Sequence, residues 1–370
     1  MNKGLMVLPE FFIHSTKFSK LLEFCNKLTG SEKNRKVLYL FYNDGLKMYA
    51  SDGCLEATFK LNQEVEAFLG TYALSIKTLK LFIEEAEDQP IEFTLSKEGI
   101  RVRQKTEILS VNNSPSKTIP QQSLFGILGE FQTNAFLAGL DFSTVHMPEN
   151  EDCYLFVFEG ILYVLTVYDK VFSLYNTQRK CKNLEVAVPY QSIRHLIKAL
   201  RLLKTEQFRL GQSVSQDRIG FQTTGNLTSI CSRSLETKEG ERLLKLIHLY
   251  DHFQPVHQIN REILKRSVTK AERISPSLPI KMTLEPDKII FELKSSAFFY
   301  SCVDEIDSCN HLPVDQKQRD AQYRLMFYGK YLKSALSRMT TNEITIYKYE
   351  NFMAFGDSTK NKLICLTDVV

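Results

Sequence analysis

Two short stretches of the sequence hold the side chains best able to bind a metal or move a proton, and the first carries two histidines. His248 and His252 stand four residues apart in HLYDH, and two imidazoles at that spacing on one helix can bind zinc. The glutamate that follows the first histidine in the H-E-x-x-H metalloprotease motif is absent. The stretch also falls in a polar segment, 234–256, which we expect to connect two domains. We therefore predict no metal site here.

The second stretch, CVDEIDSCNH, is acidic. Asp304, Glu305 and Asp307 precede Cys309 and His311, and carboxylates grouped in this way could bind a cation or act as acid and base, as in a metal-dependent nuclease. The stretch follows a predicted strand and leads to a proline, which is typical of a solvated loop. The sequence contains no G-x-x-x-x-G-K-[ST] phosphate loop and no G-x-S-x-G nucleophile elbow. We predict that the protein is not an enzyme and uses no cofactor.

Basic residues form a third pattern, which is clearest in VPYQSIRHLIKALRLLKTEQFRL (188–210). Arg194, Lys198 and Arg201 are spaced i, i+4 and i+7, so they share one face of a predicted helix. Such a face is either an ordinary solvated surface or a surface that meets phosphates, and its setting in the chain must decide between the two. The apolar face of the same helix consists of Ile193, Leu196, Ile197, Leu200 and Leu203.

The composition and charge of the chain exclude some classes of function. The chain has 370 residues, 43% of them hydrophobic and 24% charged, as expected of a soluble globular protein with two or three domains. The formal net charge is only +4, so any surface that attracts phosphates must be local. Eight cysteines without a C-x-x-C pair indicate reduced thiols. With no signal peptide and no apolar run of ~20 residues, we expect a cytoplasmic protein that does not enter the membrane.

The setting of the basic helix recurs twice more in the sequence. In residues 70–104 and 322–356, as in 188–210, a short strand leads into an amphipathic helix and further strands follow. The apolar positions of the three helices align without gaps, which indicates an internal repeat. The aligned faces are Leu79, Phe82, Ile83 and Ala86, then Ile193, Leu196, Ile197 and Leu200, then Leu332, Ala335, Leu336 and Met339.

An additional helix pattern precedes each of these segments, at 16–28, 133–145 and 260–274, and short strands follow it. The repeated unit is therefore helix, strands, helix, strands, with a length of about 120 residues that is common for a domain. Solenoid repeats are much shorter, about 20–50 residues. We predict an α+β fold with two helices packed on antiparallel sheets in each of three similar domains, which are 1–122, 123–254 and 255–370.

Lysines and arginines accompany the apolar faces of all these helices except 133–145. If equivalent helices line a common surface, these residues form a track that attracts DNA phosphates without reading sequence. No helix-turn-helix, zinc-finger or RNA-recognition signature is present to read bases. We expect the aromatic residues Phe11, Phe12, Phe156, Phe158, Phe298 and Phe299 to lie in the core. The predicted DNA-facing residues are Lys17, Lys20, Lys77, Lys80, Arg194, Lys198, Arg201, Lys265, Arg266, Lys270, Arg273, Lys330 and Lys333.

In this order of elements the whole chain resembles the bacterial DNA polymerase processivity clamps, the β sliding clamps. LKMYASDGCLEATF is similar to the first-domain hairpin of that family, with Ser51 and Asp52 in its T-D positions. NREILKRSVTKAERIS is similar to the helix that opens the third domain, and Arg273 matches a basic residue near its end. The family's proline after the first helix is missing from GSEKNRKVLYL, the chain ends in CLTDVV, and its net charge is basic, so it resembles a divergent member.

The resemblance implies a ring made of two chains joined head to tail, which encircles duplex DNA and tethers a polymerase after loading by a clamp loader. It also implies an apolar groove between the second and third domains that binds peptides of these partners. The alternative is a scaffold or adaptor with clamp-like domains that binds replication or repair partners without forming a ring. By position, the groove residues would be Val167, Leu249, Tyr250, Leu366, Val369 and Val370.

Overall fold

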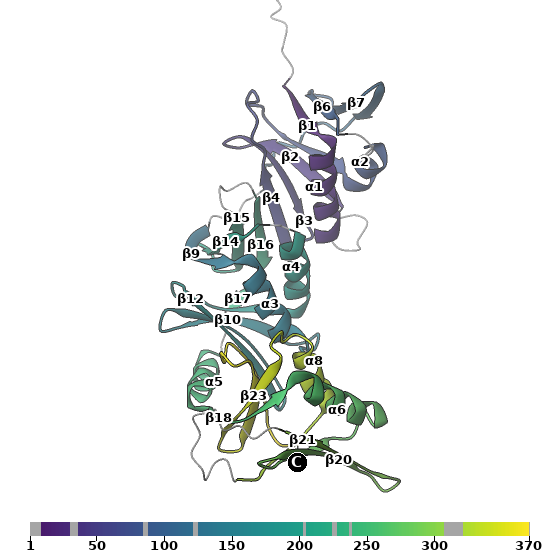
Figure 1. The fold of residues 1–370 in the computed structure, drawn as a ribbon. Coiled ribbons are helices and arrows are strands. Elements are labelled where there is room, and N and C mark those ends of the chain that lie inside the picture. Colours follow the sequence, from purple (N-terminus) through teal and green to yellow (C-terminus); the bar gives the residue numbers. More distant parts are fainter. Residues whose placement is uncertain are drawn as a thin grey trace, which may run out of the picture. The chain divides into compact units, whose positions relative to one another are not determined.

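The computed structural model describes residues 9–29, 36–83, 88–120, 125–202, 205–223, 228–236, 239–306 and 321–369 (Figure 1). Along these residues one order of elements occurs three times: a strand, a helix, four strands, a helix and three strands. The mixed α+β class predicted from the sequence is confirmed. No helix in the described ranges is both long enough and apolar enough to span a membrane.

The elements of the three repeats have the following bounds. The first repeat comprises β1 (Glu10–His14), α1 (Ser15–Leu28), β2 (Val37–Tyr42), β3 (Leu46–Ser51), β4 (Leu55–Lys60), β5 (Thr71–Ser75), α2 (Ile76–Phe82), β6 (Pro90–Leu95), β7 (Ile100–Gln104) and β8 (Glu107–Val111). The second comprises β9 (Phe125–Gln132), α3 (Thr133–Thr144), β10 (Asp152–Phe158), β11 (Ile161–Tyr168), β12 (Val171–Lys180), β13 (Glu185–Pro189), α4 (Tyr190–Leu202), β14 (Gln207–Ser213), β15 (Arg218–Thr223) and β16 (Thr228–Arg233). The third comprises β18 (Gln254–Asn260), α6 (Arg261–Ile274), β19 (Ile280–Leu284), β20 (Lys288–Lys294), β21 (Phe299–Glu305), β22 (Tyr323–Phe327), α8 (Gly329–Leu336), β23 (Glu343–Tyr349), β24 (Phe352–Gly356) and β25 (Lys362–Leu366).

Local sequence signals explain where several helices begin. The side chain of Asn260 caps α6 by accepting hydrogen bonds from the backbone N–H groups of Glu262 and Ile263. Ser75 caps α2 in the same way by accepting from Thr78 N. Each repeat also begins with a strand, β1, β9 or β18, that runs directly into its first helix. The sequence patterns did not predict these strands, because each runs into its helix without a turn between them.

From its sequence we expected the segment between the second and third repeats to be only a polar connection. The structure shows more than that. It contains β17 (Leu235–Glu236) and a thirteen-residue helix, α5 (Gly240–His252). Leu243, Ile247 and Tyr250 are spaced i, i+4 and i+7 and are buried on one face of α5. That spacing was a sequence signal for a helix.

The strands form sheets that join halves of different repeats. One sheet has the order β5-β2-β3-β4-β16-β15-β14-β9, so the first half of repeat one meets the second half of repeat two. Another has the order β17-β13-β10-β11-β12-β25-β24-β23-β18 and joins repeats two and three in the same manner. The remaining halves form two four-stranded sheets, β1-β6-β7-β8 and β21-β20-β19-β22. In both joined sheets the contact is antiparallel, through β4 with β16 and through β12 with β25.

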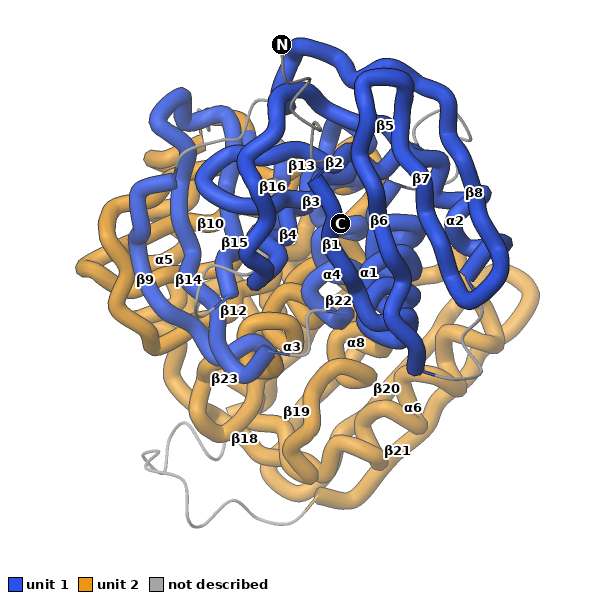
Figure 2. The backbone as a smooth tube through the Cα atoms, turned by 90° about the horizontal axis from the view of Figure 1, so that it is seen from above, with its two compact units in different colours: residues 1–133, 191–234 blue, residues 134–190, 235–370 orange. Residues whose placement is uncertain are grey.

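This pairing explains why the chain forms two compact units that do not follow the repeats (Figure 2). Unit 1 contains Met1–Thr133 and Gln191–Ser234, and unit 2 contains Asn134–Tyr190 and Leu235–Val370. Both units therefore take part of the middle repeat. The domain boundaries predicted from the sequence, at 122 and 254, stay a prediction.

Each unit has its own apolar core. In unit 1, Phe18 and Leu22 of α1 and Leu79 of α2 pack on the sheet side chains Leu38 and Met48. In unit 2, α6 and α8 cover one face of the joined sheet, while α5 covers the other.

Not all of the aromatic residues predicted to lie in the core are buried. Phe11 and Phe156 are buried, and Phe158 packs against the cluster under α5. Phe12, Phe298 and Phe299 are instead exposed, with Phe299 62% accessible. The sequence prediction was wrong for these three, because Phe12 and Phe299 occupy exposed positions of the alternating strands β1 and β21, and Phe298 lies in the turn before β21.

Candidate nucleic-acid interface and partner groove

In unit 1, the predicted basic residues of α1 and α2 lie on the exposed side of their helices. Lys17 and Lys20 are exposed on α1, while Phe18 between them is fully buried. Lys77 and Lys80 are exposed on α2, on either side of the buried Leu79. The helical period therefore divides each helix into a face that holds the core and a face that carries positive charge.

Lys198 and Arg201 of α4 are also exposed, and Arg194 is half-buried. Lys198 and Arg201 line a groove of about 770 Å³ together with Lys27 of α1, Lys36 and His195. Lys27 and Lys36 are outside the predicted set. Lys27 follows Lys20 by seven residues, so helical spacing could have found it. Lys36 lies just before β2, and only the tertiary structure brings it to this groove.

His195 in this groove is anchored to the β3–β4 hairpin. Its Nδ1 lies 3.2 Å from Oδ2 of Asp52, whose Oδ1 accepts hydrogen bonds from the backbone N–H groups of Cys54 (2.9 Å) and Leu55 (2.7 Å). Burial works to raise the pKa of Asp52, but the hydrogen bonds from His195 and the two N–H groups outweigh it and hold the pKa below its usual value. The carboxylate therefore stays charged and fixes both the hairpin turn and the histidine.

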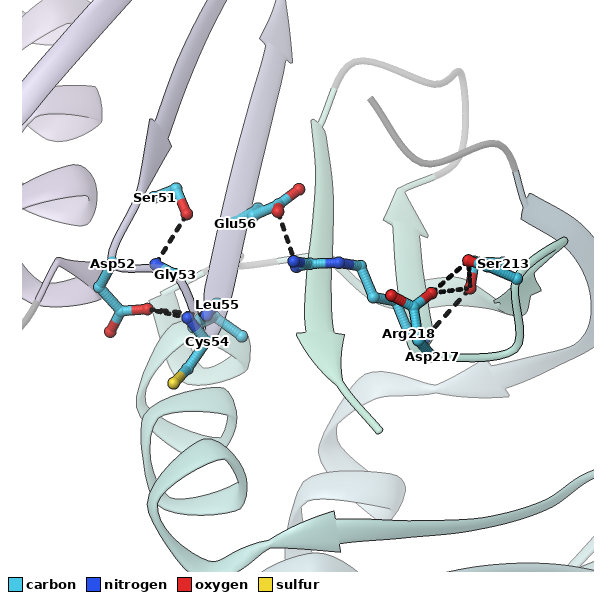
Figure 3. A network of polar contacts seen from close by, with 10 residues as sticks. Ser51, Asp52, Gly53, Cys54, Leu55, Glu56, Ser213, Asp217 and Arg218 are labelled. Atoms are coloured by element: carbon cyan, nitrogen blue, oxygen red, sulfur yellow. Dashed lines mark hydrogen bonds and ion pairs between the residues drawn. The ribbon is translucent and has the colours of Figure 1, made fainter. Parts of the chain in front are cut away.

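A second ion pair lies where β4 meets the strands of repeat two (Figure 3). The guanidinium of Arg218 is 2.6 Å from Oε1 of Glu56, and both side chains are largely buried. Burial raises the pKa of Glu56, and the charge of Arg218 works against that rise. Next to the pair, Ser213 donates to Asp217 (3.0 Å) and accepts from the backbone N–H of Arg218 (3.1 Å).

In unit 2, the basic residues of α6 form one continuous surface. Lys265, Arg266, Lys270 and Arg273 line a shallow depression of about 510 Å³ along the helix. Arg266 also pairs with Asp304 of β21 at 3.2 Å, which offsets part of its charge. The ammonium of Lys270 lies 5.9 Å from the ring centre of Tyr300, within cation–π range.

The two predicted residues of α8 differ in their surroundings. Lys330 is exposed, and its ammonium lies 4.8 Å from the ring centre of Tyr331. Lys333 is bound to Glu272 of α6 at 2.6 Å, so its charge is largely neutralised within the protein. Lys330 is the better placed of the two to meet a phosphate.

The stretches that could have held a metal or catalytic carboxylates are engaged in other contacts. On α5, His248 packs edge-on against Phe158, with ring centres 5.2 Å apart, and His252 stacks on Tyr349 at 5.3 Å. Asp304 accepts hydrogen bonds from Ser267 and Arg266. Within the described ranges, no three His, Cys, Asp or Glu side chains are grouped so that they could hold a metal ion. Asp307, Cys309 and His311 lie outside the described residues.

The structure brings only some of the predicted groove residues together. Val167, Leu249 and Tyr250 belong to the apolar cluster under α5, on one face of the joined sheet. Leu366 is buried in the cluster on the opposite face, beneath α6 and α8. Val369 is half-buried, and Val370 lies outside the described residues.

The C-terminal tail itself is held firmly beside β22. The backbone N–H of Val369 donates to Met326 O (2.9 Å), and the N–H of Met326 donates to Oδ1 of Asp368 (2.7 Å). Lys170, in the turn between β11 and β12, donates to Asp368 O at 3.0 Å. Met326 is 36% exposed. Tyr168, which precedes Lys170 in the sequence, packs against Tyr331 with ring centres 6.2 Å apart. The residues that accompany the tail had no distinctive pattern in the sequence.

Comparison with solved structures gives matches over nearly the whole chain. A DNA polymerase sliding clamp from Pseudomonas aeruginosa has a TM-score of 0.75 at 12% identity and covers 98% of this chain and 99% of its own. The DNA polymerase III beta subunit from Thermotoga maritima has a TM-score of 0.69 at 12% identity, with the same coverage. A Helicobacter pylori beta clamp bound to a DNA ligase peptide has a TM-score of 0.71 at 12% identity, again over 98% and 99%. No family model and no curated protein matches the sequence.

Proposed function

We propose that this chain, which has the fold of the bacterial β sliding clamps, is itself a ring-forming clamp. Two copies would join head to tail, encircle duplex DNA and tether a polymerase, without catalysing a reaction. Tethering raises the effective concentration of the polymerase at the primer end and so its processivity. The proposal places the protein in the cytoplasm with a clamp loader as a further partner.

The observation that carries the proposal is the pattern of joined and unjoined sheets. Within the chain, the last strand of a repeat pairs with the third strand after the first helix of the preceding repeat, as β16 does with β4 and β25 does with β12. Two strands have no partner under this rule. They are β8, the last strand of the first repeat, and β21, the third strand after the first helix of the third repeat. Each lies at an outer edge of a four-stranded sheet. A second copy would supply the missing partner for each edge, and two such contacts close a head-to-tail dimer.

The side chains at these two edges support the pairing. Ile108 of β8 is 56% exposed, and on β21 Phe299 and Val303 are 62% and 55% exposed. An exposed edge strand with apolar side chains favours pairing with another strand. Pairing of β8 with β21 of a second copy would bury these three side chains and satisfy the open backbone groups.

The exposed basic faces of α1, α2, α4 and α6 support DNA as the molecule enclosed. Lysine and arginine on helix surfaces neutralise phosphates without sequence preference, as a protein that moves along DNA requires. α3 carries no lysine or arginine and contains the acidic residue Asp141, so it would contribute little to this contact.

We place the partner-peptide groove beside the tail, at Val369 and Met326, rather than under α5. Leu366 would form its floor from within the core, while Val167, Leu249 and Tyr250 would lie behind the sheet. Position supports this assignment, since Met326 and Val369 are partly exposed and are joined by a backbone hydrogen bond.

Mass in solution separates the ring from its alternative, a monomeric scaffold with clamp-like domains. Light scattering should give about twice the chain mass of 42.7 kDa. A mass of one chain at all concentrations would favour the scaffold. The decisive test is primer extension on circular DNA with the cognate polymerase and loader, where the protein should lengthen the products of a single binding event. Unchanged product length with the protein loaded would contradict the clamp function.

A further inference from the structure

One face of the sheet in unit 1 holds a cavity that the proposed clamp function does not use. Side chains alternate along β2 and β3, so neighbouring residues point to opposite faces. Leu38 and Met48 point into the core beneath α1 and α2. Tyr39 and Tyr49 point the other way and line the cavity, away from the basic helices.

The cavity has a volume of about 470 Å³, which is within the range of small-molecule sites. Its floor is formed by Tyr39 and Tyr49, whose ring centres are 6.1 Å apart with the rings inclined by 49°. Ser51, Thr71, Ser116 and Thr118 add hydroxyl groups, and none of the residues that line it has a charged side chain.

The wall opposite the tyrosines is formed by the segment that follows β8, and it is fixed in place. Thr71 N donates to Ser116 O at 2.8 Å, and Ser116 N donates to Thr71 O at 2.9 Å, so the segment pairs with the edge of β5. Gly70 allows this approach, because a side chain there would collide with Pro115 and its φ of +102° suits glycine. The cavity is therefore built by two independent parts of the chain.

Two polar groups at the cavity are uncharged. Tyr49 is only 9% exposed, and burial raises its pKa to about 12, so the phenol is neutral at physiological pH. Ser116 is exposed, and its hydroxyl, which accepts from Thr118 N at 3.1 Å, can also donate to a ligand.

We propose that this cavity binds an uncharged aromatic ring that carries a hydrogen-bonding group. The faces of Tyr39 and Tyr49 would pack against the ring, and the Ser116 hydroxyl would bind its polar group. A phosphate or carboxylate would lose its hydration without gaining a positive partner, so anionic ligands are disfavoured. The ring could belong to a free small molecule or to a side chain of a peptide.

The absence of tryptophan from the chain provides a sensitive test, because indole fluorescence has no background from the protein. The full-length protein would be titrated into indole, N-acetyltryptophanamide and indole-3-acetate. The two neutral probes should bind, and the anionic probe should bind at least several-fold more weakly. If N-acetyltryptophanamide binds more tightly than indole, the ring belongs to a side chain of a peptide. If indole binds as tightly or more tightly, the ring belongs to a small molecule. No binding by either neutral probe, or equal binding of the anion, would overturn the proposal.

Variants locate the binding in the cavity. Tyr39→Ala should weaken binding of the neutral probes about threefold to tenfold through loss of the aromatic contact. Ser116→Ala should weaken it about twofold to tenfold through loss of one hydrogen bond. Tyr42→Ala, on the same strand but outside the cavity, is the matched control and should leave binding unchanged. If Tyr39→Ala folds with an unchanged circular dichroism spectrum and binds the probes as the native protein does, the proposed site is wrong. Both variants should leave the mass in solution unchanged, so this result is independent of ring formation.

Discussion

Individual residues hold the parts of unit 1 together through charge. Asp52, which matches the T-D hairpin of the β sliding clamps, occupies a tight turn in which Gly53 has a φ of +90°. Its carboxylate binds two backbone N–H groups of that turn and the imidazole of His195 on α4. The resemblance pointed to the position, and the structure supplies the reason for an acidic residue there.

The low pKa of Asp52 makes its contribution to stability depend on pH. The folded protein holds this pKa below the ordinary value, so the contribution is complete above about pH 4 and is lost as the pH falls through the folded pKa. Asp52→Asn should lower the free energy of unfolding at neutral pH by about 1–2 kcal/mol. Urea unfolding across the acidic range should show the difference from the native protein shrinking with falling pH. The exposed Asp44 is the control, and Asp44→Asn should have little effect at any pH. A difference for Asp52→Asn that is independent of pH would contradict this account.

The ion pair between Arg218 and Glu56 should matter more than its exposed neighbour. Removal of one member leaves a largely buried charge without its partner, so Arg218→Ala should lower the free energy of unfolding by about 3 kcal/mol. Arg209→Ala is a matched control on the adjacent strand, because Arg209 pairs with Glu130 in a more exposed position worth at most about 1 kcal/mol. Equal losses for the two variants, measured by denaturant unfolding, would show that burial of the pair has no consequence.

At the scale of elements, the helical period sorts each helix into an apolar and a basic face. On α4, Ile193, Leu196 and Leu200 are buried while Lys198 and Arg201 are exposed, as the spacing predicts. The sequence also predicted Lys333 for this surface, and Glu272 neutralises it. An ion pair between two helices depends on how they pack, which spacing along one helix does not encode.

The two exposed residues of α4 provide a test of DNA contact. If both meet phosphates, the double variant Lys198→Ala, Arg201→Ala should flatten the dependence of log K on log salt by about 2, since each phosphate contact contributes about 0.9 to that slope. Binding of short duplex DNA would be measured by fluorescence anisotropy at several salt concentrations. Lys97→Ala, which removes an exposed charge from the turn between β6 and β7, should leave the slope unchanged. The same slope in the double variant as in the native protein would remove α4 from the DNA surface.

At the scale of the whole molecule, the open sheet edges at β8 and β21 are the feature with the largest consequence. The chain joins halves of successive repeats twice, and one half remains at β8 and one at β21. The same rule applied between copies yields the proposed dimer. The same kind of strand pairing would then form every junction, both within one chain and between two chains.

A charge placed on the edge of β21 should prevent the contact between copies. Val303→Lys would bring an ammonium into the strand pairing with β8, and lysine on an edge strand opposes such pairing. Light scattering should give the mass of one chain at a concentration where the native protein is dimeric. Val214→Lys is the control, because Val214 is 85% exposed in the turn between β14 and β15 and belongs to neither edge strand, and it should keep the native mass. A dimer that survives Val303→Lys would argue against pairing through β21.

The sequence by itself determined two helices in each repeat, their two faces and the threefold repetition, because helical periodicity depends on residues only three or four positions apart. It missed α5 and the strands that open the repeats. It also led to the α+β class and to the sliding-clamp resemblance, and the structural matches confirm both. Only the tertiary structure decided that β4 pairs with β16, that Phe299 is exposed and that Lys36 joins the groove beside α4. It alone separated Leu366 from Tyr250, because strand neighbours point to opposite faces and the layer that covers each face comes from a distant part of the chain.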